Sequence, residues 1–280
     1  MIKFIKNNFL LGSLILVYCL FVLLLQVIIN PNPRAETHEA IAENHYLVHW
    51  SYGGSRNPSR WGKISAEYVL CKTGQYQSPI NFDSDNFERK INSESTPKPL
   101  KFNYQRIPLT VKNNGHTIQV DYSGGSSGGS SMEIDGETYR LLQFHFHTPS
   151  EHTVDEMAYG MELHLVHQNQ AGNFAVVGVF IEEGAENYFL QQIWDHLPES
   201  EGEKTLEKLM VNAYNFLPEN REYYSYDGSL TTPPCSEAVK WYVMTTPIEA
   251  SAEQIEQFME IYPMNARPVQ PLHRRKIHHH

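Results

Sequence analysis

The sequence predicts a mainly β domain of the α+β class, with a few short helices. Short runs that alternate in polarity, or are rich in β-branched and aromatic residues, recur along the chain. Clusters of Gly, Pro and Asn separate these runs and are typical of turns. Helical patterns are few by comparison. We therefore expect a single domain in which strands joined by turns form most of the structure.

Five runs are predicted to be strands, because they combine period-two alternation with residues that favour sheets. They are Thr117–Tyr122, Tyr139–His147, Glu162–His167, Phe174–Ile181 and Ala238–Thr245. Three further segments have the apolar spacing of a helix. They are Tyr188–Leu197, Glu203–Leu209 and Ala252–Ile261. The last of these follows Ser251, and Gln254 stands three residues on, which is the pattern of a capping box.

The first thirty residues differ in composition from the rest of the chain. The 21 residues from Phe9 to Ile29 carry no charge and follow Lys3 and Lys6. As a helix rising ~1.5 Å per residue, they would reach roughly the 30 Å of a bilayer core. Residues 1–30 are therefore predicted to be either a signal peptide or an uncleaved membrane anchor. Both alternatives make residues 31–48 a linker and place the remaining chain outside the cytoplasm.

Net charge and cysteine content limit the function further. A formal charge of −10 and a pI near 5.8 argue against nucleic acid as a partner, because phosphates require a basic face. Cys19 lies in the apolar run, which leaves Cys71 and Cys235 as an even pair. In an oxidising compartment this pair predicts a disulfide, with two free thiols as the alternative.

Two segments have unusual composition. Residues 123–131 contain only Ser and Gly, the composition of a flexible linker, and lie between two predicted strands. We expect a mobile hairpin tip there, whether natural or inserted. Residues 278–280 are all histidine and resemble part of a purification tag, so they are excluded from the candidate site. The predicted folded domain therefore spans residues 49–277.

Histidines two residues apart provide the strongest chemical signal. Alternation along a strand places His145 and His147 on one face together with Gln143. The same geometry places His164 on one face with Glu162 in a second strand. Two neighbouring strands would then bring three imidazoles to one point, as a catalytic zinc requires. Gln143 and Glu162 are spaced to hydrogen-bond the second ring nitrogen of a ligand.

Other interpretations of these histidines exist. Histidines in strands are often satisfied by hydrogen bonds in the core, without any metal. A cupin metal site is a second alternative, because His145, His147 and Glu151 fit the spacing of its first motif. The glycines that bracket that motif and the cupin's second motif are absent here, so spacing disfavours a cupin dioxygenase with iron.

Several longer motifs resemble those of the alpha-class carbonic anhydrases, in the family's order. They are Gln143-Phe144-His145-Phe146-His147, Ser150-Glu151-His152, Glu162-Leu163-His164-Leu165-Val166-His167 and Ser229-Leu230-Thr231-Thr232-Pro233-Pro234. The resemblance begins near Trp50 and ends near Leu272. It implies a central, mostly antiparallel sheet of about ten strands, a zinc cofactor and the reversible hydration of CO₂. Thr148-Pro149-Ser150 resembles the bacterial branch, which implies a periplasmic enzyme, either soluble or tethered to the inner membrane by residues 9–29.

The resemblance also implies roles for individual residues. His145, His147 and His164 would bind Zn²⁺, and the resulting zinc-bound hydroxide would attack CO₂. Thr231 would accept the proton of that hydroxide in a hydrogen bond and donate its own to Glu151, because a carboxylate only accepts. An ordinary turn is the alternative for the Thr231 segment. The Cys71–Cys235 pair also falls where secreted members of the family have their disulfide.

The remaining candidates line the substrate path or carry protons. Thr232 would assist binding of CO₂ or bicarbonate, and the other matches to the family's apolar CO₂ pocket are Val166, Val176, Leu230, Val239 and Trp241. Each valine alone is equally compatible with core packing. His116 matches the proton-shuttle position, where an exposed histidine without a role is the alternative. Three further matches would order the intervening waters: Tyr52, Asn114 and Gln119.

The implied partners are small molecules. Sulfonamides and anions are expected inhibitors, weak ester hydrolysis is an expected side activity, and the chain is expected to be a monomer or dimer. A non-catalytic recognition domain of the same fold is the main functional rival. That rival typically lacks zinc ligands, whereas all three histidines are present here together with Glu151 and Thr231.

Overall fold

The computed structural model describes residues 48–83, 88–89, 99–122 and 129–280. The chain divides after Leu47, and Val48–His280 forms a compact unit by itself. The predicted signal or anchor, nearly all of the linker, and residues 123–128 of the Ser/Gly segment lie outside the described residues. Within the described ranges, no helix is long and apolar enough to cross a membrane.

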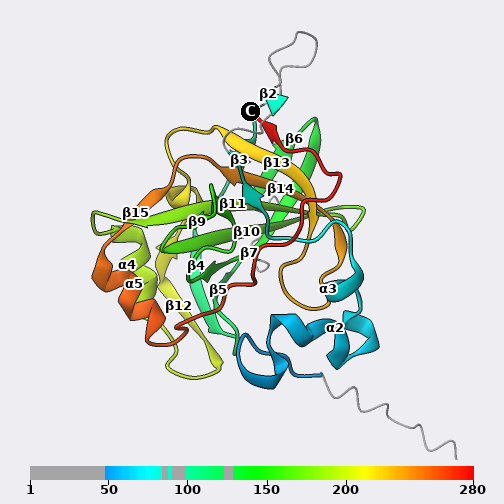
Figure 1. Ribbon diagram of the computed structural model, residues 1–280. Coiled ribbons are helices and arrows are strands. Elements are labelled where there is room, and N and C mark those ends of the chain that lie inside the picture. The colour runs from blue at the N-terminus through cyan, green and yellow to red at the C-terminus, as the bar shows by residue number, and fades with distance from the viewer. Residues whose placement is uncertain (1–47, 84–87, 90–98, 123–128) are drawn as a thin grey trace, which may run out of the picture. The chain divides into compact units, whose positions relative to one another are not determined.

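A large mixed sheet occupies the centre of this unit (Figure 1). Among the described residues it has thirteen strands, and all but three of its strand pairs are antiparallel. The main path runs in the order β12 (Gly202–Val211), β4 (Ile107–Asn113), β5 (Ile118–Asp121), β7 (Glu137–His147), β10 (Met161–Asn169), β11 (Phe174–Glu183), β14 (Glu237–Met244), β13 (Tyr223–Ser229), β16 (His278–His279) and β2 (Glu88–Arg89). The fold class predicted from the sequence is therefore confirmed.

The other elements are short. Off the main path, the large sheet includes β3 (Lys101–Asn103), β6 (Ser131–Ile134) and β15 (Ile248–Ala250), and a separate small sheet has β1 (Asn81–Phe82), β8 (Thr153–Val154) and β9 (Met157–Ala158). The helices are α2 (Trp61–Ile64), α3 (Leu70–Thr73), α4 (Tyr188–Trp194) and α5 (Ala252–Met259), and the 3₁₀ turns are η1 (Gly54–Arg56), η2 (Pro58–Arg60), η3 (Ala66–Tyr68) and η4 (Ala213–Phe216).

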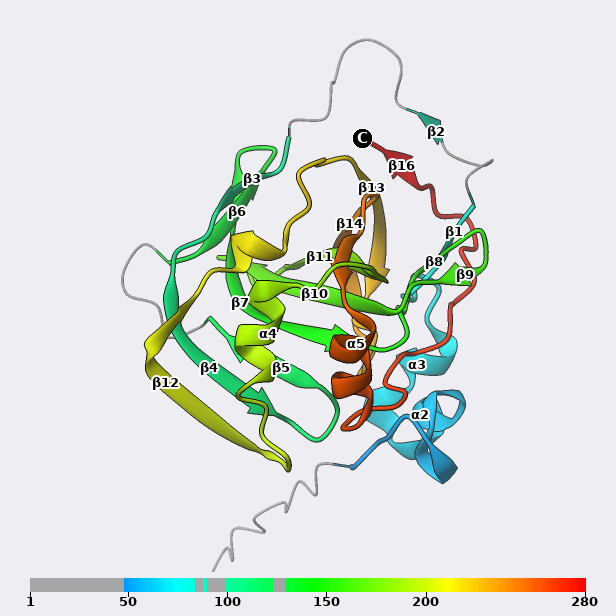
Figure 2. The same cartoon turned by 90° about the vertical axis from the view of Figure 1, so that its left-hand side faces the viewer.

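Helices α4 and α5 cover one face of the sheet, as Figure 2 shows. Phe146 of β7 points to this side and contacts Trp194 of α4 with ring centroids 4.8 Å apart. Leu163 and Leu165 of β10 belong to the same cluster of buried apolar side chains. Because side chains alternate along a strand, the residues between them point to the opposite face, where a second apolar cluster lies. That opposite face carries the predicted site.

All five predicted strands correspond to strands of the sheet, and two of the three predicted helices are helices. Helix α5 begins with the expected capping box of Ser251 and Gln254. The predicted helix Glu203–Leu209 is wrong, because this segment is part of β12. Leu206 and Leu209 have helical spacing, but pairing with β4 overrides that local preference. A register irregularity between Leu206 and Met210 lets both leucines pack against the core.

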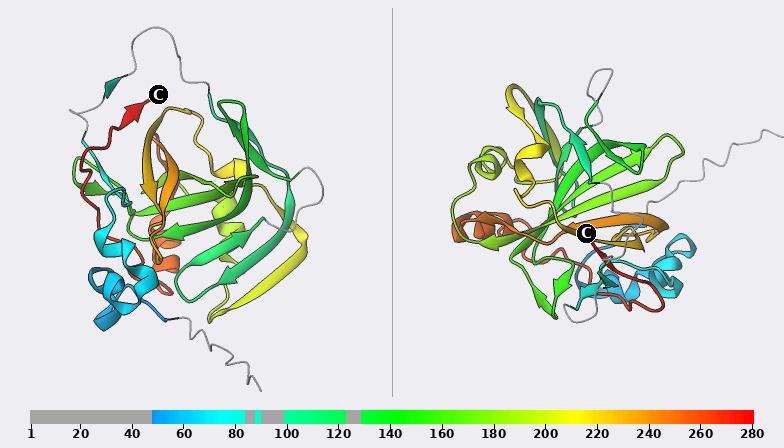
Figure 3. Two further views of the ribbon diagram at one scale, coloured as in Figure 1. Left: turned by 90° about the vertical axis from the view of Figure 1, so that its right-hand side faces the viewer. Right: turned by 90° about the horizontal axis from the view of Figure 1, so that it is seen from above.

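The chain returns to the sheet at its C-terminus (Figure 3). His278 and His279, which resemble a tag in the sequence, form β16 and pair antiparallel with Ser225 and Tyr224 of β13. His280 Nε2 lies 2.7 Å from Ser225 Oγ. These histidines lie in the sheet and are absent from the histidine cluster that forms the candidate site.

Helices α2 and α3 are joined to the sheet by a disulfide. Cys71 of α3 is bonded to Cys235, 164 residues further along the chain. The predicted disulfide is thus present, and the alternative of two free thiols does not hold. Trp61 of α2 is fully buried beside this bond. In Figure 1, α2 and α3 lie apart from α4 and α5.

Candidate metal centre and active site

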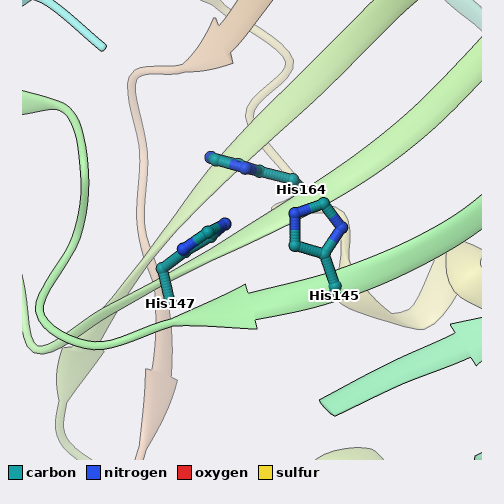
Figure 4. Close-up of side chains that lie close together, drawn as sticks. All are labelled: His145, His147 and His164. Atoms are coloured by element: carbon teal, nitrogen blue, oxygen red, sulfur yellow. The ribbon is translucent and has the colours of Figure 1, made fainter. Parts of the chain in front are cut away.

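Three histidine rings converge on the face of the sheet opposite α4 and α5. His145 and His147 project from β7, and His164 projects from the neighbouring strand β10, as Figure 4 shows. One nitrogen from each ring lies within 4.8 Å of the others. The register pairs His145 directly with His164, so the convergence follows from antiparallel alignment of two alternating sequences. His147 and His164 are each only 1% exposed.

Hydrogen bonds orient the two candidate ligands on β7, His145 and His147. The Nδ1–H of His145 donates to Gln143 Oε1 at 2.9 Å, as the sequence spacing predicts. The Nδ1–H of His147 donates to the backbone carbonyl of Asn265 at 2.7 Å. In both rings this leaves Nε2 as the nitrogen with a lone pair. The supporting groups therefore fix the tautomer that each ring presents to the cluster.

A carboxylate orients the third ring. The Nε2–H of His164 donates to Glu162 Oε1 at 2.8 Å, which leaves Nδ1 to face the cluster. Glu162 is fully buried. Gly178 of β11 lies opposite His164, and a Cβ there would come within 2.9 Å of Glu162 Oε1. Glycine at this position thus leaves room for the carboxylate.

The charges around the cluster shift its pKa values in opposite directions. Burial, reinforced by His147 and His164, lowers the pKa of His145 well below its ordinary value. Burial also opposes the charged form of His164, but the Glu162 carboxylate outweighs it and raises the pKa of His164. Burial favours the neutral form of Glu162, yet His152 and His164 hold its pKa well below the usual range. Glu162 is therefore an ionised group in the protein interior.

The cluster has the donor set of a catalytic zinc site. Nε2 of His147 is buried and has no hydrogen-bond partner among the described residues. A buried polar atom without a partner is costly, and metal coordination is one way to satisfy it. Three imidazole nitrogens with one open position are the ligands that catalytic zinc prefers. His152, Glu162 and His164 also lie close together, but their 2.7 and 2.8 Å contacts are hydrogen bonds.

Glu151 lies beside the ligands and is almost completely buried. Its Oε1 accepts a hydrogen bond from the backbone N–H of Arg267 at 2.8 Å. Its Oε2 is 3.9 Å from Nδ1 of His164 and has no hydrogen-bond partner within the described ranges. The bond from Thr231 that the resemblance implies is therefore not formed in this structure, and one carboxylate oxygen remains as an acceptor.

Thr231 and Thr232 lie in the turn that follows β13. Thr231 is buried, Thr232 is partly exposed, and the carbonyl of Thr232 accepts from the N–H of Cys235 at 2.8 Å. The peptide bond between Pro233 and Pro234 is cis. The turn ends at the disulfide, which ties it to α3. The local backbone is thus a turn that places the Thr231 side chain in a buried position, and this geometry is compatible both with a catalytic role and with an ordinary turn.

The five predicted apolar residues pack together beside the histidines. Val166 pairs with Val176 across β10 and β11, and Val176 pairs with Trp241 across β11 and β14. Val239 and the partly buried Leu230 belong to the same cluster. The ring of Trp241 lies 4.9 Å from that of His164, centroid to centroid. An apolar surface therefore adjoins the third ligand.

His116 lies on a turn outside the ligand cluster and is partly exposed. Its ring stacks on Trp50 with centroids 3.7 Å apart and an interplanar angle of 9°. It also lies 5.7 Å from the ring of His49. Burial, together with His49, lowers the pKa of His116, and Glu201 partly opposes this shift. The pKa of the His116 ring is thus lower than that of an exposed histidine.

The three predicted water-ordering residues lie in two places. Asn114 Nδ2 donates to Gln119 Oε1 at 3.4 Å, and Asn114 Oδ1 accepts from the backbone N–H of His116. Gln119 pairs in register with His145, next to the ligands. Tyr52 packs edge-on against Trp50, and burial and Glu151 raise its pKa well above the ordinary value. Tyr52 therefore keeps its hydroxyl proton.

Several residues that support the site have no role predicted from the sequence. Asn265 holds His147, and Arg267 holds Glu151, from 118 and 116 residues away in sequence. The guanidinium of Arg267 is buried and donates to three acceptors, which are Ser78 O, Cys71 O and Gln77 Oε1. Such long separations leave no local periodicity. Only the family resemblance, which extends to about Leu272, covers this segment.

Comparisons with known proteins agree with this geometry. Residues 56–280 match the family model described as eukaryotic-type carbonic anhydrase. A carbonic anhydrase from Nostoc sp. is 46% identical over 231 residues, which cover 82% of this chain and 85% of that protein. A carbonic anhydrase from Pectobacterium atrosepticum is 40% identical, with coverage of 83% and 91%.

Solved structures show the same fold. The alpha-carbonic anhydrase from Thermovibrio ammonificans, in complex with the inhibitor sulfanilamide, superposes with a TM-score of 0.77 at 43% identity. The match covers 82% of this chain and 99% of that one. The ligand geometry, the family model and these relatives lead to one assignment. The chain belongs to the alpha-class, eukaryotic-type carbonic anhydrases, a family of lyases that hydrate CO₂.

Proposed function

We propose that this chain catalyses the reversible hydration of CO₂ to bicarbonate and a proton with a Zn²⁺ ion held by His145, His147 and His164. The observation that carries this proposal is the convergence of their three nitrogens within 4.8 Å, with Nε2 of His147 buried and without a hydrogen-bond partner in the described part of the chain. When bound, zinc lowers the pKa of a water toward neutrality and supplies a nucleophile, an effect for which carbonic anhydrases are themselves the reference case.

Glu151 and Thr231 orient the nucleophile in this proposal. Oε1 of Glu151 is already occupied by the N–H of Arg267, so Oε2 is the oxygen that accepts from the Thr231 hydroxyl. A carboxylate only accepts, which leaves the Thr231 oxygen to accept a hydrogen bond from the reacting water. The attacking lone pair then points away from Thr231 and toward the apolar surface formed by Val166, Val176 and Trp241, here called the apolar wall. Thr232 and the backbone N–H of Thr231 bind bicarbonate, and anions and sulfonamides compete there.

The apolar wall binds the substrate, and His116 exports the proton that the reaction releases. CO₂ offers few hydrogen-bonding groups, and the surface formed by Val166, Val176 and Trp241 suits it beside the third ligand. His116 passes the released proton to buffer, since its ring is partly exposed and an imidazole can both take up and release a proton. Asn114 and Gln119 order the waters between. Weak hydrolysis of activated esters follows from the same nucleophile.

We also propose that the enzyme works outside the cytoplasm, in the periplasm. The disulfide between Cys71 and Cys235 supports this location, because such bonds persist in oxidising compartments. The uncharged run from Phe9 to Ile29 supports export by a signal peptide or an anchor. A mass measurement on protein from its native host distinguishes a cleaved from an uncleaved segment.

The decisive experiment combines metal analysis with stopped-flow CO₂ hydration. Purified protein is expected to contain one zinc per chain, to hydrate CO₂ and to lose this activity with a sulfonamide. Replacing Glu151 with Gln adds an amide donor where Thr231 needs an acceptor, and should lower kcat by roughly 10²–10³-fold. A chain that carries zinc but does not hydrate CO₂ would contradict the proposal and favour a recognition domain.

A second variant tests the shuttle separately. His116→Ala is expected to slow turnover by about 10²-fold in dilute buffer, because proton export becomes limiting. Concentrated imidazole buffer should restore most of the rate, since it accepts the proton directly. Normal turnover of His116→Ala in dilute buffer would remove His116 from the mechanism and leave the zinc site unaffected.

A further inference from the structure

The Glu162 carboxylate joins two functional groups of the site. Its Oε1 accepts from the Nε2–H of His164 at 2.8 Å. Its Oε2 accepts from the backbone N–H groups of Glu151 and His152, at 2.9 and 2.8 Å. A rotation of this carboxylate would therefore disturb both a proposed ligand and the segment that carries Glu151. The groups that hold the Glu162 carboxylate in place therefore also hold His164 and the backbone of Glu151 in place.

His152 supplies the fourth hydrogen bond to this carboxylate. Its Nδ1–H donates to Glu162 Oε1 at 2.7 Å, so each carboxylate oxygen has two donors. Its Nε2 lies 2.6 Å from the hydroxyl of Tyr226, which in turn lies 2.8 Å from Ser78 Oγ. Because Nδ1 carries the proton of a neutral ring, Nε2 is an acceptor, and the single hydroxyl proton of Tyr226 lies between this nitrogen and Ser78 Oγ. The chain Ser78–Tyr226–His152–Glu162 thus ends at His164.

Close packing holds this chain in place. The ring of Phe82 stacks on His152 at 5.5 Å, and Trp241 contacts it edge-on at 4.8 Å. Tyr226 is 4% exposed, and His152 and Ser78 are completely buried. A Cβ on Gly228 would come within 2.2 Å of Ser78 Oγ and 2.8 Å of the Tyr226 ring. The fold therefore provides space for this arrangement and for few others.

We infer that His152 and Tyr226 are positioning residues for the metal centre. They hold the Glu162 carboxylate so that it presents Nδ1 of His164 to the ion and keeps the backbone of Glu151 in register. Neither residue touches substrate or metal. The inference rests on the proposed zinc site, because it assigns these residues a role in the affinity of that site for zinc.

A second buried Tyr–His pair in the same molecule provides the matched control. Tyr104 Oη lies 2.7 Å from Nε2 of His167, nearly the same contact as between Tyr226 and His152. The Nδ1–H of His167, however, donates to the backbone carbonyl of Ala175 at 3.2 Å. Among the residues that the structure describes, this pair contacts neither a carboxylate nor a proposed zinc ligand through a hydrogen bond. Removing either tyrosine hydroxyl deletes the same chemical group from an equally buried histidine.

The experiment compares Tyr226→Phe with Tyr104→Phe in the full chain. Zinc affinity is measured by competition with a chelator, and free energies of unfolding by denaturant titration. Both variants should be destabilised, but only Tyr226→Phe should raise the zinc dissociation constant, by about three- to tenfold. His152→Ala should raise it by roughly 10–100-fold, the range seen when groups that orient metal ligands are removed. His152→Asn retains a donor near the Nδ1 position and should recover most of the affinity.

A second measurement is independent of metal binding. In metal-free protein with ¹⁵N-labelled histidine, NMR identifies which nitrogen of His164 carries the proton. Tyr226→Phe and His152→Ala should increase the fraction protonated at Nδ1, while Tyr104→Phe should leave it unchanged. Equal zinc affinities and equal tautomer fractions in the two tyrosine variants would overturn the inference. A wild-type chain without zinc affinity would overturn the proposed function, and the tautomer measurement would still decide the positioning role.

Discussion

The two faces of strand β10 are both buried but differ in how their side chains are stabilised. On the face toward α4 and α5, Leu163 and Leu165 are fully buried in the apolar core. On the other face, Glu162 and His164 are equally buried and are held by hydrogen bonds. Burial of the leucines is favourable by itself, whereas burial of an ionised carboxylate is unfavourable unless every oxygen is satisfied.

The two faces therefore contribute differently to the free energy of folding. The apolar face contributes stability, and roughly 2–5 kcal/mol is lost when a buried leucine is cut to alanine. On the polar face, four hydrogen-bond donors surround the Glu162 carboxylate. This face orients the side chains of the site, and its burial adds little stability by itself. Neighbouring residues on one strand should therefore respond differently to the same substitution.

The largest expected effect compares His164→Ala with Leu165→Ala. Loss of one of the three proposed ligands should weaken zinc binding by about 10²–10³-fold, if each ligand contributes roughly 3–4 kcal/mol. Leu165→Ala should instead lower the free energy of unfolding by about 3 kcal/mol and leave zinc stoichiometry at one. Chelator competition and denaturant unfolding measure the two quantities. If both variants lost zinc to the same extent, the two faces would not be separable.

A histidine on the apolar side gives the second prediction, a pH dependence of stability. Burial lowers the pKa of His167 to about 4, against about 6.5 in the unfolded chain. As pH falls from 6.5 toward 4, the unfolded state binds a proton that the folded state does not. The free energy of unfolding should therefore decrease over this window, by about 3 kcal/mol in total.

The measurement compares wild type with His167→Asn, which removes the titrating group. Any loss of zinc through protonation of the proposed ligands would be common to both proteins, so the difference between their unfolding curves isolates His167. Wild type should lose about 3 kcal/mol more between pH 6.5 and pH 4. Parallel pH profiles would show that the ring takes up its proton in the folded state more readily than its burial indicates.

How far the sequence predicts this molecule depends on the sequence distance between partners. Alternation within β7 and β10 is local, and it placed His145, His147 and His164 on one face together with Gln143 and Glu162. The same reasoning identified the strands that carry them. It required only that the two strands be neighbours, which the register confirms.

Contacts between distant segments could not be derived in this way. Asn265 and Arg267 reach His147 and Glu151 across more than a hundred residues, and nothing in their own segment indicates the partner. The error at Glu203–Leu209 has a related cause, because pairing with β4 determined the strand β12 against its local helical spacing. Pairing between segments that are far apart in the chain cannot be derived from local patterns in a single sequence.

The smallest expected effect compares two adjacent valines of β11, which repeat the contrast of β10 with apolar side chains only. Val176 faces the site and packs with Val166 and Trp241, while Val177 belongs to the core under α4 and α5. Each change to alanine should lower the free energy of unfolding by about 1–2 kcal/mol, because each deletes the same two methyl groups. Only Val176→Ala should also lower kcat/KM for CO₂, by about fivefold, since it removes part of the surface against which the substrate is expected to lie.

Stopped-flow measurements of CO₂ hydration with both variants test this difference in kcat/KM. An equal loss in Val177→Ala would mean that the activity responds to general loosening of the sheet, and that the apolar wall has no direct contact with CO₂.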